Sequence, residues 1–252
     1  MQASEKEVQP RVSLITGAAA GIGRHLAQDL LAAGQRLILV DRDLEGLQSL
    51  VEPFPGRSTL IQHDFLQDTG LEEQVSAAIE TQGRLSGLIH VAGLSNTLPL
   101  KALSRIDLER VMAVNTFAAF DLVKHCCKAR HHAPGMSVVF VSSVYSLVGS
   151  AANSAYAMSK AALNGLARSL AIEFAPRRLR FNCVAPGFIK TEMLDALVQR
   201  MGPDYLAELE RLHPLGLGST QDVSNAIQFL LSDQARWITG SVMSVDGGFT
   251  AQ

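Results

Sequence analysis

The sequence is short of the residues that build disulfide-stapled, membrane-spanning and nucleic-acid-binding proteins. Its 252 residues include only three cysteines, two adjacent and one remote, a spacing that fits neither a disulfide framework nor a zinc site. Lys plus Arg number 22 against 24 Asp plus Glu, so the cationic excess of a nucleic-acid or membrane-surface binder is lacking. No apolar run reaches the roughly 18 residues that span a bilayer, and the polar start at residues 1–10 lacks the order of a signal peptide. These shortages predict a cytoplasmic protein without a metal site, a nucleic-acid partner or a membrane anchor.

Strand-like and helix-like segments alternate along the chain. Hydrophobic residues make up 47% and charged residues 18%, which excludes a disordered chain. Short apolar runs rich in β-branched residues predict strands at 12–16, 37–41, 59–64, 88–92, 137–142, 180–185 and 241–245. Longer helical patterns lie between them, the clearest over 22–33, 107–130 and 155–174. This alternation predicts an α/β fold: a single doubly wound, Rossmann-type domain over 1–252, with a parallel sheet and helices on both faces.

A glycine-rich loop follows the first predicted strand and leads into a helix. Its residues are Gly17, three alanines ending at Ala20, and then Gly21, Ile22 and Gly23. Glycines let the backbone approach a pyrophosphate, and the helix N-terminus offers unpaired N–H groups and a positive dipole end. The spacing differs from the commoner G-x-G-x-x-G fingerprint, so a tight turn that only allows close helix–strand packing is an alternative. We expect this loop to bind a dinucleotide.

Acidic residues at the ends of the second and third predicted strands suggest the kind of dinucleotide. The Asp41 carboxylate can accept hydrogen bonds from a ribose 2′,3′-diol and would repel a 2′-phosphate, which favours NAD(H) over NADP(H). The neighbouring Arg42 keeps NADP(H) open, and a capping or solvated Asp41 is the structural alternative. Asp64, predicted to close the third strand, could reach an adenine amino group, and Phe65 beside it is expected to contact the cofactor.

A second group of polar residues has the character of a catalytic set. Tyr156 and Lys160 are spaced to share one face of a helix. A free tyrosine has a pKa of about 10, and a lysine one turn away favours its phenolate. Ser143, at the end of the fifth predicted strand, can donate a hydrogen bond to a reacting oxygen. Asn115 stands in an apolar run and needs partners, which a water chain to Lys160 would supply. Each spacing alone can arise by chance, but together they predict catalysis.

The combination resembles the short-chain dehydrogenase/reductase family, most closely its 3-oxoacyl-[acyl-carrier-protein] reductase branch. The resemblance runs from the glycine loop to a terminal Val245-Asp-Gly-Gly248. The family motifs match at Gly17, Gly21, Gly23, Asp64, Ala92, Gly93, Asn115, Ser143, Tyr156, Lys160, Pro186, Gly187 and Thr191. The resemblance implies a seven-stranded parallel sheet and a homotetramer built from the two long helices.

The resemblance also implies a role for each matched residue. Tyr156 would be the general acid/base, and Lys160 would orient the nicotinamide ribose and lower the pKa of Tyr156. Ser143 would polarise the carbonyl, and Asn115 would hold a proton-relay water. Further cofactor contacts are expected from the segment Pro186, Gly187, Ile189 and Thr191, of which Ile189 and Thr191 would fix the carboxamide.

One position departs from the family pattern. The family's Asn-Asn-Ala-Gly after the fourth strand is here His90-Val91-Ala92-Gly93. The first Asn braces the sheet by hydrogen bonding, and His90 can do the same with either ring nitrogen. We expect cofactor binding to survive the change.

The substrate is the least defined part of the prediction. Residues 188–217 are expected to cover the site, and Tyr145 and Asn153 flank the substrate position beside Ser143 and Tyr156. The leading expectation is a small carbonyl or alcohol substrate, for example a 3-oxoacyl thioester. A polyol, a steroid or a cyclic diol is the alternative among enzymes, and a non-catalytic dinucleotide sensor or scaffold is the alternative from another class.

Basic residues near two helix ends suggest a partner. Lys128 and Arg130 end the predicted 107–130 helix, and Arg177 and Arg178 follow the 155–174 helix. By resemblance, arginines in comparable places would dock an acidic carrier protein that bears the thioester. The alternative is that these cations only offset helix dipoles.

Overall fold

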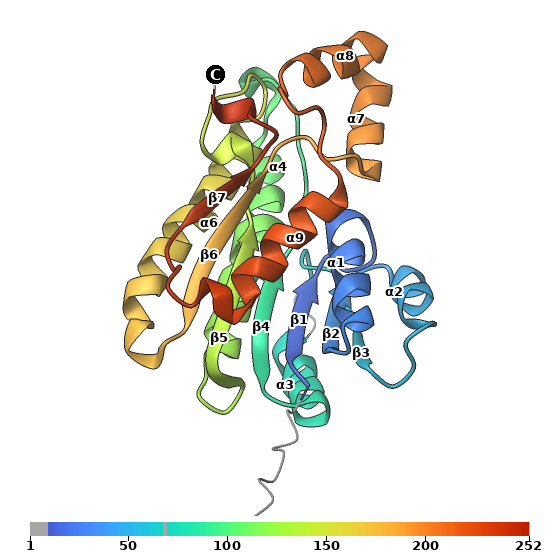
Figure 1. The fold of residues 1–252 in the computed structure, drawn as a ribbon. Helices are drawn as coiled ribbons and strands as arrows, with labels where there is room; N and C mark the ends of the chain where they lie inside the picture. Colours follow the sequence, from blue (N-terminus) through green and yellow to red (C-terminus); the bar gives the residue numbers. More distant parts are fainter. Residues whose placement is uncertain (1–9, 68–69, 252) are drawn as a thin grey trace, which may run out of the picture.

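A sheet of parallel strands organises the molecule (Figure 1). The computed structural model describes residues 10–67 and 70–251, so the start of the chain, used above to argue against a signal peptide, lies outside the described residues except for Pro10. The strands are β1 (Val12–Thr16), β2 (Arg36–Asp41), β3 (Ser58–Gln62), β4 (Leu85–His90), β5 (His132–Val141), β6 (Arg180–Pro186) and β7 (Val242–Val245). They form one seven-stranded sheet in the order β3-β2-β1-β4-β5-β6-β7. The predicted doubly wound α/β fold is confirmed.

The strand order fixes where a ligand can bind. The chain moves outward from β1 to β3 on one side, returns to β4, and then moves outward to β7 on the other side. A crevice therefore opens between β1 and β4, outside their carboxyl ends, at the point where the order reverses.

Helices cover both faces of the sheet. They are α1 (Gly21–Ala32), α2 (Leu44–Val51), α3 (Leu71–Gln82), α4 (Arg105–Met112), α5 (Ala118–Cys126), α6 (Ser154–Glu173), α7 (Glu192–Met201), α8 (Pro203–Arg211) and α9 (Thr220–Leu231). Buried residues of α1, α2 and α9 share one hydrophobic cluster, and those of α3, α5 and α6 share the other. Helices α7 and α8 stand above the carboxyl edge of the sheet (Figure 1).

Strand β5 shows why the apolar runs of the sequence are continuous. Val138 and Phe140 belong to the cluster with α3, α5 and α6, whereas Val139 and Val141 belong to the cluster with α1, α2 and α9. Because each face of the strand is buried under helices, alternation with polar residues is not needed.

The segment predicted as a single helix over 107–130 is helical from Arg105 to Cys126, but it is not one regular α-helix and it ends four residues early. The structure divides the segment into α4, a π-helical stretch η2 (Ala113–Phe117) and α5, which ends at Cys126. Side chains from outside the helix bind within η2: the Val114 carbonyl oxygen lies 3.1 Å from Nε2 of His90. Lys128 and Arg130 therefore lie in the turn after α5 and not on a helix.

Several strand boundaries also differ from the prediction, and β4 and β5 begin earlier, at Leu85 instead of 88 and at His132 instead of 137. Strand β3 ends at Gln62, so Asp64 lies in the turn beyond it. Strand β4 ends at His90, so Val91 and Ala92 belong to the loop that follows. Among the described residues, no helix has the length and apolar character needed to cross a membrane.

Candidate active site

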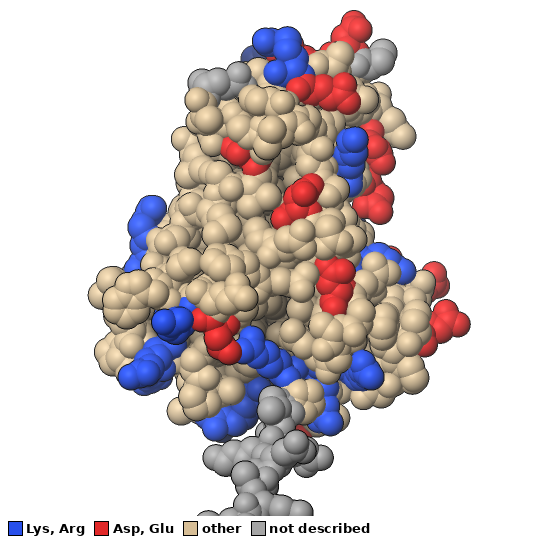
Figure 2. All heavy atoms as spheres, in the orientation of Figure 1, with Lys and Arg blue, Asp and Glu red and all other residues tan. Residues whose placement is uncertain are grey.

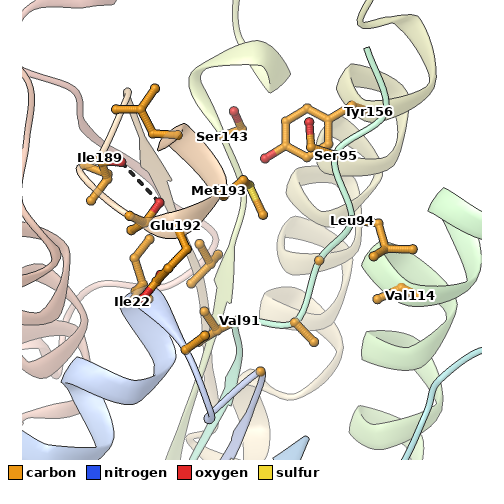
Figure 3. A pocket seen from close by; sticks show the side chains of 18 of the residues that line it. Ile22, Val91, Leu94, Ser95, Val114, Ser143, Tyr156, Ile189, Glu192 and Met193 are labelled. Atoms are coloured by element: carbon orange, nitrogen blue, oxygen red, sulfur yellow. Dashed lines mark hydrogen bonds between the residues drawn. The ribbon is translucent and has the colours of Figure 1, made fainter. Parts of the chain in front are cut away.

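A cavity of about 1040 Å³ opens at the carboxyl edge of the sheet (Figure 3). Most residues predicted from the sequence meet at its walls. Those that line it are Gly17, Ala20, Gly21, Ile22, Asp41, Arg42, Asp64, Phe65, Ala92, Gly93, Ser143, Tyr145, Asn153, Tyr156, Lys160, Pro186, Gly187, Ile189 and Thr191. Of the predicted site residues, Gly23 and Asn115 do not line the cavity.

The glycine loop is shaped by close backbone contacts. Gly17 and Gly21 have φ angles of 67° and 50°, in the left-handed region. A Cβ atom on Gly17 would lie 2.7 Å from the backbone nitrogen of Ala92, and one on Gly23 would collide with the Gly17 carbonyl oxygen. The close-packing alternative raised from the sequence is therefore correct for Gly23, and it does not compete with a binding role for the loop.

The amino terminus of α1 has the chemistry of an anion site. Its N-cap is Ala20, which has no side-chain acceptor, and its first turn has no acidic residue. The first-turn N–H groups and the positive end of the helix dipole therefore face the cavity without a capping side chain. An anionic diphosphate fits this cradle, so the residues present fit a dinucleotide.

His90 and Thr16 brace the floor of the cavity. Nε2 of His90 lies 3.1 Å from the Val114 carbonyl oxygen, which can only accept, so this nitrogen carries the proton. Nδ1 then accepts from the Thr16 hydroxyl at 2.9 Å. The Thr16 oxygen in turn accepts from the N–H groups of Val91 and Ala92, each at 3.2 Å. The expectation that His90 replaces the bracing Asn is confirmed.

The state of His90 follows from its surroundings. Burial, with the Lys160 ammonium as a smaller contribution, lowers the pKa of His90 to about 3. The ring is therefore neutral at ordinary pH and holds one fixed tautomer.

Asp41 lies at the rim of the cavity beside the glycine loop. Its two carboxylate oxygens accept from the N–H groups of Ala19 and Asp43, at 3.0 and 3.1 Å. A carboxylate oxygen can accept more than one hydrogen bond, so both keep capacity toward a ligand. The capping role considered for Asp41 belongs to Asp43, which accepts from the N–H of Gly46 at the start of α2. Arg42 is exposed at the same rim.

Asp64 and Phe65 form the neighbouring wall. An oxygen of Asp64 accepts from the N–H of Leu66 at 3.0 Å, which holds the turn after β3. The Phe65 ring contacts the rings of His63 and His90 edge-on, with centroids 5.0 and 6.1 Å apart. These contacts fix Phe65 at the side of the cavity without using its exposed edge.

Ser143 and Tyr156 meet at the other end of the cavity. Figure 3 shows both hydroxyl groups facing the same space, close to Met193. Burial raises the pKa of Tyr156, and a hydrogen bond with Ser143 opposes that rise. The Ser143 oxygen also accepts from the N–H of Tyr145 at 3.2 Å, which fixes its position at the end of β5.

The expected lowering of the Tyr156 pKa by Lys160 is not what the structure gives. The Lys160 ammonium donates to the Val141 carbonyl at 2.7 Å and lies 5.8 Å from the centroid of the Tyr156 ring. The ammonium therefore bonds to a backbone oxygen and lies over the Tyr156 ring, and it does not contribute to the pKa of Tyr156. Burial lowers the pKa of Lys160 itself to about 8.

Asn115 acts from behind the cavity wall. Its side chain accepts from the Leu94 N–H at 2.7 Å and donates to the Leu94 carbonyl and the Ser159 hydroxyl. The fully buried amide is thus satisfied by protein atoms. Asn115 thus holds the loop after β4 against α6. This role was not predicted from the sequence, which suggested only a water chain from Asn115 to Lys160.

Comparison with known proteins places the chain in a family. A family model described as enoyl-(acyl carrier protein) reductase matches residues 17–250. The 3-oxoacyl-[acyl-carrier-protein] reductase of Aquifex aeolicus is 32% identical over 97% of this chain and 99% of its own length. The cyclohexanol dehydrogenase of an Acinetobacter species is 32% identical over 96% of each chain. This chain belongs to the short-chain dehydrogenase/reductase family.

Solved members of this family share the architecture closely. A structure of ElxO with NADP bound is 28% identical, with a TM-score of 0.88 over 96% of this chain and 100% of that chain. A 4-hydroxyisoleucine dehydrogenase complexed with NADH is also 28% identical, with a TM-score of 0.87 over 96% of this chain and 99% of that chain. As a member of the short-chain dehydrogenase/reductase family, this protein is an oxidoreductase.

The segment 188–217, expected from the sequence to cover the site, supplies much of the wall beyond Ser143. Met193 and Leu197 from α7, Tyr205 from α8, and Phe188 from the loop after β6 all line the cavity. The sequence alone favoured packing of these apolar residues onto the body of the protein over contact with a substrate, because an apolar stripe on a short helix is typical of packing. The predicted residue Asn153 lines the cavity, but its amide is already bonded to Thr97, Ser150 and Ala151.

The basic residues lie far from the cavity. Lys128, Arg130, Arg177 and Arg178, here called the basic patch, are exposed at the turns that precede β5 and β6. Figure 2 shows Lys and Arg side chains gathered at this lower end of the molecule, where the strands begin. The Lys128 ammonium lies 3.6 Å from the Glu72 carboxylate, so part of its charge is already paired.

Proposed function

We propose that this protein interconverts a secondary alcohol and a ketone by hydride transfer with NAD(H), and that Tyr156 is the general acid/base. One observation carries the proposal. A single cavity has an uncapped helix N-terminus and glycine loop at one end, and the Ser143 and Tyr156 hydroxyls at the other. This arrangement suits a ligand that is anionic in its middle and reactive at one end.

The choice of NAD(H) rests on Asp41. Its carboxylate faces the rim where an adenosine ribose would lie, and a 2′-phosphate there would meet a negative charge. Solved relatives hold NADP in one case and NADH in another, which supports a nicotinamide dinucleotide of either kind. Arg42, exposed at the same rim, is the residue that would favour NADP(H).

Each residue at the reactive end has a distinct task in this proposal. The nicotinamide supplies a hydride when it is bound. In the reducing direction, Tyr156 gives its proton to the carbonyl oxygen while Ser143 donates a hydrogen bond to the same oxygen. Lys160 would orient the nicotinamide ribose, and Ile189 and Thr191 would hold the carboxamide. Asn115 keeps the loop after β4 in place behind these groups.

The leading substrate is a 3-oxoacyl thioester. Support comes from the similarity to a 3-oxoacyl-[acyl-carrier-protein] reductase along nearly the whole chain. The basic patch offers positive charge to an acidic carrier. In one chain, however, the ten residues of β5 separate the patch from Ser143, a distance of about 30 Å. A carrier on the patch would therefore have to serve the cavity of a neighbouring subunit.

A homotetramer would provide that neighbour. Large apolar side chains are exposed along α4, η2, α5 and α6, namely Ile106, Phe117, Phe120 and Met158. Exposed apolar residues on adjoining helices are typical of an interface. The assembly proposed here is cytoplasmic and binds neither nucleic acid nor a membrane.

A cyclic secondary alcohol is the second candidate, because the substrate end is aromatic. Tyr145, Phe188 and Tyr205 line the cavity there, and the Tyr145 and Phe188 rings meet edge-on at 5.9 Å. The similarity to a cyclohexanol dehydrogenase supports the same substrate class. Such a wall suits the apolar body of a ring or a steroid better than a polyol.

Parallel assays of NADH and NADPH oxidation test these proposals. The purified protein would be offered acetoacetyl thioester and, separately, cyclohexanone. Turnover with NADH and thioester supports the leading proposal, turnover with cyclohexanone alone supports the second, and turnover with NADPH alone overturns the argument from Asp41. Tight NADH binding without turnover of any ketone or alcohol would favour a dinucleotide sensor.

A further inference from the structure

His213 joins parts of the chain that are far apart in sequence. It follows α8 and is 2% exposed. Its Nδ1 atom lies 2.6 Å from the Leu209 carbonyl oxygen of α8, and its Nε2 atom lies 3.2 Å from the backbone nitrogen of Phe188. A carbonyl oxygen can only accept and a backbone N–H can only donate, so the partners fix the tautomer. Nδ1 carries the proton, Nε2 accepts, and the ring is neutral.

This histidine is fitted tightly to the loop after β6. A Cβ atom on Gly187 would lie 2.8 Å from Nε2 of His213. The Phe188 ring stands edge-on to the His213 ring, with centroids 5.7 Å apart. Gly187 and Phe188 both line the cavity, whereas His213 does not. His213 therefore supports the cavity wall from behind.

The C-terminal segment packs on the same histidine. The Phe249 ring lies 4.9 Å from the His213 ring and 6.5 Å from the Tyr145 ring. The Asp246 carboxylate holds this segment by accepting from the N–H groups of Gly248 and Thr250 and from the Thr250 hydroxyl. The rings of Tyr145, Phe188 and Phe249 thus form one aromatic wall, and His213 ties it to α8.

Helix α8 contacts this wall at a second point. Burial and a hydrogen bond with the Tyr145 phenol raise the pKa of Tyr205 to about 12. Tyr205 lies in the first turn of the same helix whose end leads to His213, so α8 is close to cavity-lining residues near both of its ends. Helices α7 and α8 stand above the carboxyl edge of the sheet, where such anchoring decides how they cover the cavity (Figure 1).

We infer that His213 is a positioning residue: its neutral imidazole locks α8 onto Phe188 and so fixes the aromatic wall against which the substrate is held. The residue acts on substrate placement and not on proton transfer or dinucleotide binding. The kinetic part of this inference rests on the proposed function, whereas the anchoring of α8 does not.

Two substitutions separate the hydrogen bonds from the packing. His213→Leu fills the site but removes the donor and the acceptor, while His213→Gln keeps one of each. His132→Leu is the matched control. His132 is also buried, but it lies at the far end of β5, and its Nε2 atom has no hydrogen-bond partner among the residues that the structure describes. Thermal midpoints measured for all variants show whether a loss of fold accounts for any effect.

Kinetics and proteolysis then give independent readouts. With the better of cyclohexanone and acetoacetyl thioester, we expect His213→Leu to raise KM about tenfold, the equivalent of one lost buried hydrogen bond. Its kcat and its Kd for NADH, titrated by fluorescence, should change less than about threefold, since His213 contacts neither the hydroxyls nor the glycine loop and Gly187 is only one of the residues expected to contact the cofactor. Tryptic cleavage after the exposed Arg200 and Arg211 should accelerate in His213→Leu. His213→Gln and His132→Leu should match the wild type in each assay.

Three results would overturn the inference. The first is equal cleavage rates in the wild type and His213→Leu. The second is a His213→Gln variant as impaired as His213→Leu, and the third is a Kd for NADH that rises in step with KM. If the wild type reduces neither probe, the proposed substrate class fails, and the proteolysis alone decides the role of His213.

Discussion

The two ends of the cavity are built in different ways. The dinucleotide end is made mostly of backbone: positive-φ glycines, an uncapped helix N-terminus and the Thr16 hydroxyl that gathers the N–H groups of the loop after β4. The substrate end is made of side chains from distant segments, with Tyr145 after β5, Phe188 after β6 and Tyr205 on α8. A backbone site leaves a local motif in the sequence, whereas a side-chain wall exists only once the chain has folded.

The largest effect should come from the reactive end. We expect Tyr156→Phe to lower kcat by about 1000-fold or more, because the proton donor is removed. The Kd for NADH should stay within about twofold, since the phenol oxygen is remote from the glycine loop. Steady-state kinetics and fluorescence titration check the two halves of this prediction. A variant that keeps a tenth of the rate would show that another group transfers the proton.

Next in size is the loss of a glycine at the dinucleotide end. Gly17→Ala should cost about 3 kcal/mol of stability, because it adds both backbone strain and a collision with Ala92. Gly34→Ala is the control: its φ is 81°, but no atom of residues 10–67 or 70–251 beyond its immediate chain neighbours lies within 4 Å of the added Cβ. The Gly34→Ala variant should lose only about 1 kcal/mol of its free energy of unfolding. Urea unfolding measures both, and equal losses would mean that the close contact at Gly17 is unimportant.

A smaller effect should separate the two forms of the dinucleotide. Asp41→Asn keeps an acceptor for the Ala19 N–H but removes the charge. We expect the ratio of Kd for NADPH to Kd for NADH to fall about 30-fold, the value of a charge-assisted hydrogen bond. Glu45→Gln, an equal charge change on exposed α2, should leave the ratio unchanged. An unaltered ratio in Asp41→Asn would remove Asp41 from cofactor selection.

The smallest predicted effect concerns the buried Lys160. Burial lowers its pKa to about 8, against 10.5 in the unfolded chain. Below pH 8, Lys160 is protonated in both the folded and the unfolded protein, and the folded state carries the full free-energy cost of the buried charge. Between these pKa values only the unfolded state holds the proton, so stability rises with pH. Relative to Lys160→Met, the wild type should gain about 1.4 kcal/mol from pH 7 to pH 9.

Urea unfolding of both proteins at the two pH values gives this difference. The comparison with Lys160→Met cancels the titration of the buried Cys126 and Cys127, whose raised pKa values do not depend on Lys160. A difference that does not change with pH would show that Lys160 keeps its ordinary pKa.

The sequence predicted the fold and the conformation of the glycine loop well, for physical reasons. Parallel strands buried on both faces have continuous apolar runs in the sequence. The observed bounds of β1 and β6 therefore agree closely with the strands predicted from those runs. Gly17 and Gly21 are visible because no other residue takes their φ without strain. The bracing role of His90 could be predicted because an imidazole ring offers both the hydrogen-bond donor and the acceptor that this position needs.

The remaining features depend on contacts between distant segments. The π-helical turn at Asn115 is set by bonds from His90 and to Leu94, which helical periodicity does not reveal. The orientation of Lys160 depends on the Val141 carbonyl, so its expected effect on Tyr156 could not be judged from their spacing. His213 and Phe249 lack any motif, and only the fold brings them to the aromatic wall.

The central claim is that the cavity joins a nicotinamide to a carbonyl held by Ser143 and Tyr156. The most direct test uses NADH deuterated at either face of C4, with whichever of cyclohexanone and acetoacetyl thioester the protein reduces. Mass spectrometry of the alcohol should find deuterium on the carbinol carbon from one face of NADH and not from the other. An alcohol without deuterium from either face, or with equal label from both, would contradict direct transfer in this cavity.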